Sequence, residues 1–126
     1  ARDVEQDKRP DKRLYAITEK GKAAFRESLQ RQPAADKVRS DVLFMLFFAQ
    51  HLPREHLANI LDNRIAWYQG ALDRMATLQK EGPPPPPGAA FVRGLGQVVY
   101  QAAADYLVAN REALLAAAES NSAAAE

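Results

Sequence analysis

The stretch PREHLANILDNRIAWYQGALDRMATLQK, residues 53–80, decides the fold. Apolar residues recur through it at spacings of three and four, which places them on one face of a helix. Pro53 suits the first turn, where its missing N–H costs nothing, and no later proline interrupts the pattern. We predict one amphipathic helix roughly 40 Å long, at about 1.5 Å per residue. Its apolar positions are Leu57, Ile60, Leu61, Ile65, Tyr68, Leu72, Met75 and Leu78.

A second long helix is predicted from Ala89 to Glu119, with the tail after it fraying. Between the two helices stand five prolines, Pro83–Pro87, which predict a stiff polyproline II spacer of about 15 Å. A ligand for a proline-binding domain is the alternative, but the place between two helices already explains the run. The second apolar stripe comprises Phe91, Leu95, Val98, Val99, Ala102, Tyr106 and Ala109.

A short helix that is apolar on all sides is predicted from the letters DVLFMLFFAQHL, residues 41–52. This helix and the two long helices together carry more apolar surface than one short chain can bury by itself, so we predict a homodimer. A self-contained helical hairpin is the alternative. The predicted dimer interface comprises Leu57, Leu61, Tyr68, Leu72, Leu95, Val99, Ala102 and Tyr106.

The N-terminal letters VEQDKRPDKRLYAITEKG, residues 4–21, predict two short strands, 2–6 and 13–18, joined by a cationic tip. Thr18 is the expected N-cap of a helix that ends before Pro33. Residues 1–40 hold 11 Lys/Arg against 7 Asp/Glu, whereas residues 41–126 hold 6 against 9. The N-terminal end of the chain is therefore suited to binding a polyanion. The alternative is that the charged residues simply form a solvated face.

The sequence offers little chemistry for catalysis. There is no cysteine, and His51 and His56 do not share a helical face, so neither a thiolate site nor a histidine metal pair is expected. No glycine-rich phosphate loop follows a strand. We expect no enzyme, no catalytic residue, no cofactor and no metal. The longest apolar run, 42–49, is far too short to span a membrane, and a cytoplasmic protein is expected.

Five aromatic residues gather around the short apolar helix and the helix after it. Phe44, Phe47, Phe48 and Trp67 could line a cavity for a small molecule, with Tyr68 beside them. The alternative is that these rings simply form core, because aromatic residues at helical spacing usually pack.

The letters RPDKRLYAITEKGKAAF followed by DVLFMLFFAQHLPREHL resemble the PadR family of bacterial transcription regulators. In that family an arginine–proline phrase, a tyrosine, an aliphatic residue, a threonine and a glycine close a winged helix-turn-helix domain. The matching positions here are Arg9, Pro10, Lys12, Tyr15, Ile17, Thr18 and Gly21. In that family three helices, among them the recognition helix, precede these residues. They have no counterpart in this sequence, so we expect the chain to be a piece of a longer protein.

The resemblance implies a mainly α fold with a small β-hairpin, in which a partial winged helix-turn-helix precedes a long-helix dimerisation domain. The expected organisation is a wing hairpin and helix at 1–32, a linker at 33–41 and a helical domain at 42–126. It implies a DNA-binding repressor that acts as a homodimer and responds to a small, often aromatic, effector. The alternative is a dimerisation or adaptor module without a nucleic-acid role. The residues expected to contact double-stranded DNA are Lys8, Arg9, Lys12, Arg13 and Tyr15.

Overall fold

The computed structural model describes residues 2–4, 12–14 and 16–125, with side chains from 16 to 121. The chain divides into two compact units, Ala1–Val38 and Arg39–Glu126, which we describe separately. The division lies inside the segment 33–41 that the sequence analysis assigns to a linker.

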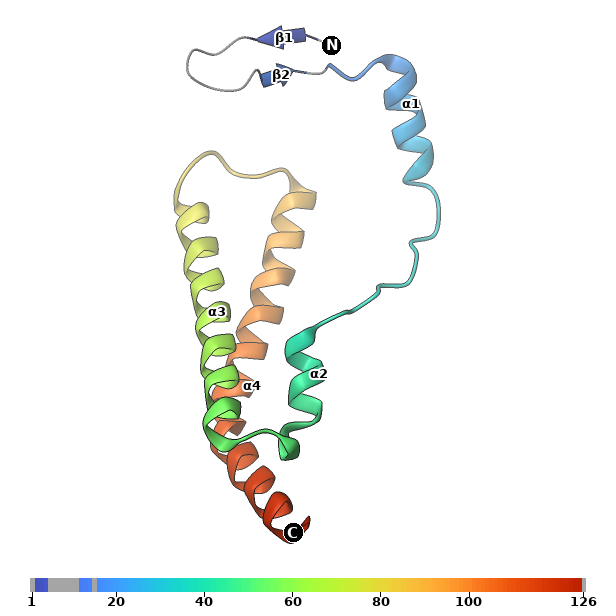
Figure 1. Cartoon of the computed structure of the whole chain (residues 1–126). Helices are drawn as coiled ribbons and strands as arrows, with labels where there is room; N and C mark the ends of the chain where they lie inside the picture. Colours follow the sequence, from blue (N-terminus) through green and yellow to red (C-terminus); the bar gives the residue numbers. More distant parts are fainter. Residues whose placement is uncertain (1, 5–11, 15, 126) are drawn as a thin grey trace. The chain divides into compact units, whose positions relative to one another are not determined.

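The first unit contains two strands and one helix (Figure 1). Strand β1, Arg2–Val4, pairs antiparallel with strand β2, Lys12–Leu14. Helix α1, Glu19–Ser28, begins after Thr18, whose hydroxyl accepts a hydrogen bond of 3.0 Å from the backbone N–H of Gly21. The predicted N-cap is thus confirmed.

The fold class predicted for this end of the chain is wrong. A wing is a hairpin that packs on the helices of its own domain, whereas α1 buries no residue. The pairing that the structure describes joins only three residues with three, and the second strand ends at Leu14 instead of Thr18. Beyond it, Ile17 is exposed and Thr18 caps α1. The described residues therefore contain no winged helix-turn-helix.

The second unit is helical (Figure 1). Helix α2, Asp41–Phe47, is capped by the Ser40 hydroxyl and leads through a short 3-10 turn, η1, Ala49–His51. Helix α3, Arg54–Lys80, follows Pro53, and helix α4, Pro87–Ala125, returns antiparallel beside it. The long helix predicted from Pro53 to Lys80 is confirmed.

Helix α4 is longer than predicted at both ends. Pro87 already belongs to its first turn, as the fixed φ of proline allows. The proline spacer is correspondingly one residue shorter, 83–86, and Gly82 before it has a φ of 88°, which glycine adopts without strain. The tail expected to fray is helical as far as Ala125, since alanine has the highest helix propensity of any residue.

The core of the second unit lies where α3, η1 and the C-terminal half of α4 meet. Leu57, Leu61 and Leu115 are almost fully buried there, beside the small residues Ala49 and Ala118. Fully burying a leucine side chain contributes about 1.5–3 kcal/mol, so these leucines hold the two long helices together.

An ion pair also joins α3 to α4. The guanidinium of Arg111 donates to both carboxylate oxygens of Asp62, at 2.7 and 3.0 Å. These hydrogen bonds lower the pKa of Asp62 below its ordinary value and raise that of Arg111. Arg54 and Glu119 form a second, longer pair at 3.5 Å between the same helices.

Candidate functional site

Helix α4 has two apolar faces, and only one of them is covered. Ala104, Leu115 and Ala118 point to the interior. The stripe predicted from the sequence lies on the opposite side of the helix. Each residue turns the helix by about 100°, so residues 91, 95 and 102 point in roughly the opposite direction from residues 104, 115 and 118. Phe91 is 74% exposed and Leu95 56% exposed. We call this surface the α4 stripe; its members are Phe91, Val92, Leu95, Val98, Val99, Ala102 and Tyr106.

The residues predicted for a dimer interface fall into two groups. Leu57 and Leu61 are 1% and 2% exposed, so they belong to the chain's own core and are not available to a second chain in this structure. Tyr68 and Leu72 are half-buried on the side of α3 that meets α4. The other four, Leu95, Val99, Ala102 and Tyr106, lie on the α4 stripe.

Helix α2 also leaves one face uncovered. Its inner side, with Val42, Met45 and Leu46, is half-buried. Leu43, Phe44 and Phe47 point outward, and Phe47 is 77% exposed. We call these three residues the α2 outer face. The rings of Phe44 and Phe47 each pack edge-on against Phe48, at centroid distances of 5.2 and 5.1 Å.

Trp67 belongs to a different aromatic cluster, on α3. Its ring centroid lies 5.0 Å from that of Tyr68 and 5.5 Å from that of Tyr100 on α4. The guanidinium of Arg64 lies over the face of Trp67, 4.2 Å from the centroid. Such a contact favours the ordered position of both side chains. Of the four predicted ligand residues, the structure brings together the three phenylalanines, while Trp67 packs with the tyrosines.

A groove of about 310 Å³ separates α2 from α3. Trp67 lines it, but the opposite wall consists of Val42 and Met45 rather than the phenylalanines. Because α2 is apolar on all sides, the sequence carried no signal for which of its faces turns toward α3. The remaining lining residues are Asp41, Ile60, Asn63 and Arg64.

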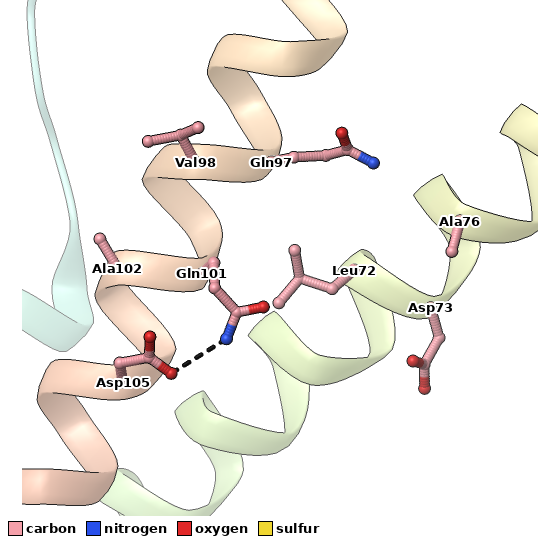
Figure 2. A pocket seen from close by; sticks show the side chains of 8 residues that line it. All are labelled: Leu72, Asp73, Ala76, Gln97, Val98, Gln101, Ala102 and Asp105. Atoms are coloured by element: carbon pink, nitrogen blue, oxygen red, sulfur yellow. Dashed lines mark hydrogen bonds between the residues drawn. The ribbon is translucent and has the colours of Figure 1, made fainter.

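A second groove, of about 690 Å³, runs between α3 and α4 (Figure 2). Its apolar residues are Leu72 and Ala76 on α3 with Val98 and Ala102 on α4, so it is continuous with the α4 stripe. Its polar residues are Asp73, Gln97, Gln101 and Asp105. The amide of Gln101 donates to Asp105 at 2.9 Å, along the surface of α4.

The residues predicted to contact DNA belong to the first unit. Lys12 and Arg13 lie in β2. Lys8, Arg9 and Tyr15 fall outside the residues that the structure describes. Their roles stay predictions.

Among the described residues, no group of three or more His, Cys, Asp or Glu residues could hold a metal ion. No helix among the described residues is long and apolar enough to cross a membrane.

Comparison with known proteins finds similarity in three-dimensional structure. No family model matches the chain, and no curated protein matches it. The crystal structure of smu.1604c from Streptococcus mutans UA159 matches with a TM-score of 0.75 and 26% identity, over 87% of this chain and 66% of that one. Bacillus subtilis PadR, in complex with operator DNA, matches with a TM-score of 0.65 and 20% identity, over 94% of this chain and 68% of that one.

The chain thus spans about two thirds of the length of each of these structures. At such identities the likeness concerns the fold. The protein has a PadR-like fold.

Proposed function

We propose that this protein is a DNA-binding transcription regulator, acts as a homodimer and is not an enzyme. The observation that carries the proposal is the structural likeness to Bacillus subtilis PadR in complex with operator DNA, over 94% of this chain. The excess of Lys and Arg in residues 1–40 supports it, because a DNA backbone attracts that charge. A regulator of this kind works in the cytoplasm, where bacterial DNA is.

The basic segment 8–13 is the proposed contact with DNA. Lys8, Arg9, Lys12 and Arg13 place four cations within six residues. Cations so close together suit the regular spacing of phosphates along a duplex. Contacts with phosphates position a protein on DNA and carry affinity, but they carry no direct information about base sequence.

Removing a phosphate contact should therefore weaken binding to all sequences alike. For Arg9→Ala and Lys12→Ala we expect lower affinity and a salt slope that is smaller by about 0.9 for each cation removed from the DNA backbone. The measurement is a salt titration by fluorescence anisotropy, with the protein encoded by the complete reading frame. The duplexes are one selected by the wild-type protein from a random library and one of unrelated sequence.

Lys80→Ala is the matched control, because it removes the same charge at the C-terminal end of α3. It should keep both the wild-type affinity and the wild-type slope. If Arg9→Ala and Lys12→Ala behave like this control, the basic segment is only a solvated turn. An adaptor module without a nucleic-acid role would then be the better interpretation.

The homodimer is proposed from the uncovered apolar surface. Phe91, Val98 and Tyr106 on the α4 stripe are all more than half exposed, as are Phe44 and Phe47 on α2. Monomeric soluble proteins rarely expose contiguous apolar patches beyond a few hundred Å². A second copy offers the same surface, and two-fold dimers are by far the commonest oligomers.

A small aromatic effector is proposed for the groove between α2 and α3. Trp67 is the only tryptophan in the sequence and lines this groove, so its fluorescence reports on the surroundings of the groove. We expect the emission of Trp67 to change when a flat phenolic or drug-like molecule from a screening panel binds. Val42→Phe, which fills the wall opposite Trp67, should abolish the response.

Thr77→Phe is the control for that substitution, since it adds the same ring on α3 outside the groove. It should leave the response unchanged. Unaltered emission across the panel would assign Trp67, with Tyr68 and Tyr100, to the core alone.

A further inference from the structure

We propose that the proline spacer between α3 and α4 is a docking site for a second protein. The partner is a domain with an aromatic-lined groove that recognises a polyproline II segment. The spacer, residues 83–86, lies outside both the basic segment 8–13 and the α4 stripe. The proposal therefore adds an interaction to the proposed binding of DNA and does not depend on it.

The sequence of the spacer imposes a polyproline II backbone. The ring of proline fixes φ near −65°, and a residue that precedes a proline is restricted to extended or polyproline II conformations. Each proline from Pro83 to Pro86 is itself followed by a proline. The spacer is therefore stiff before any partner arrives, and binding it costs little conformational entropy.

The spacer is presented at the surface, at the turn between α3 and α4 (Figure 1). Three of its four prolines are exposed, and Pro85 is half-buried. Next to the spacer, the side-chain amide of Gln79 donates to that of Gln97 at 3.1 Å and ties α3 to α4. Two antiparallel helices can be joined by about two to five ordinary loop residues, so the connection alone does not require consecutive prolines.

A groove of about 380 Å³ lies beside the spacer. Leu78 at the end of α3, Ala90 at the start of α4 and the rings of Pro83–Pro85 give it an apolar lining. Arg93 is the one charged residue among the described residues that line it. A guanidinium is attracted to the face of an aromatic ring, so the groove suits an aromatic side chain of the partner.

The charge of Arg93 specifies the partner further. The residue is exposed, and among the described residues it forms no ion pair. Its guanidinium can therefore meet a carboxylate as well as a ring. The partner's groove for the spacer should combine aromatic residues, as grooves for polyproline II segments do, with an acidic residue at its edge.

Purified SH3, WW and EVH1 domains are suitable probes, because all three bind polyproline II segments through aromatic grooves. The protein encoded by the complete reading frame is immobilised, and binding of each domain is measured by biolayer interferometry. We expect at least one domain to bind. Pro84→Gly together with Pro85→Gly should weaken that binding at least tenfold, because glycine releases the backbone of the spacer.

The double variant should keep its helix content by circular dichroism, since both substitutions lie outside α3 and α4. Pro33→Gly is the control, because it also exchanges an exposed proline for glycine but lies outside the spacer. It should bind like the wild-type protein. Full binding by the double variant would overturn the proposal, as would a panel in which no domain binds. Either result would leave the DNA-binding regulator standing.

A second variant tests the groove and leaves the spacer intact. Arg93→Glu reverses the charge beside the prolines and should weaken binding of the same domain at least fivefold. Arg74→Glu makes the same change of charge at an exposed position of α3 that does not line the groove, and it should bind like the wild-type protein. Equal affinities of these two variants would exclude Arg93 and its groove from the docking site.

Discussion

Replacing Leu95 and Val99 together with glutamate is expected to convert the protein to monomers. Both side chains lie on the α4 stripe, more than half exposed within one chain. In a dimer the glutamates would place carboxylates in an apolar seam, where an uncompensated polar group costs about 2–7 kcal/mol. Since 1.4 kcal/mol is a factor of ten, the dissociation constant should rise at least about a thousandfold.

The monomers should remain folded, because neither residue belongs to the chain's own core. Size-exclusion chromatography with light scattering gives the mass, and far-ultraviolet circular dichroism gives the helix content. Asn59→Glu with Ala66→Glu is the matched control, since both positions are exposed on α3 away from the stripe. A folded Leu95→Glu, Val99→Glu protein that still has the mass of a dimer would exclude this interface.

The long helices could be predicted from the sequence because their signal is strong and local. Apolar residues at spacings of three and four run without a break from Leu57 to Leu78, and Pro53 marks the start. Thr18 before Glu19 likewise predicts a helix start from two adjacent residues. Such features depend on neighbours in the chain, which the sequence displays directly.

Which apolar face meets which partner could not be predicted in the same way. The stripes of α3 and α4 look alike in sequence, yet Leu61 is buried and Leu95 is exposed. The residues that cover Leu61, such as Ala49 and Leu115, come from other elements. Their approach depends on the path of the chain through η1 and the proline spacer, and this path has no periodic signal.

The α2–α3 groove illustrates the same limit. An all-apolar helix such as α2 gives no preferred direction, so the sequence pointed to phenylalanine walls where the structure has Val42 and Met45. At the N-terminal end, alternation from Arg13 to Thr18 predicted a strand. In the structure that strand is Lys12–Leu14, and Thr18 caps α1.

The position of α2 links the proposed effector groove to the proposed dimer interface. Val42 and Met45 on its inner side line the groove, whereas Phe44 and Phe47 face outward. If a ligand favours one position of this short helix, it changes the surface offered to the second subunit. By thermodynamic reciprocity, dimerisation would then change the affinity for the ligand by the same factor.

Truncating Leu61 should cost far more stability than truncating Leu95, although the sequence places both on apolar stripes. Leu61 packs against Leu57 and Leu115 in the core, so Leu61→Ala leaves a cavity and should lower the free energy of unfolding by about 2–5 kcal/mol. Leu95→Ala removes a side chain that its own fold leaves more than half exposed. Its cost to the fold of one chain should stay below about 1 kcal/mol.

The measurement is urea unfolding followed by circular dichroism at several protein concentrations, because unfolding of a dimer depends on concentration. Leu61→Ala should shift the midpoint downward at every concentration, including those at which the protein is monomeric. Leu95→Ala should shift it only where the wild-type protein is dimeric. Equal shifts of the two variants under monomeric conditions would contradict the division of α4 into a covered face and an uncovered stripe. They would then place Leu95 in the same core as Leu61.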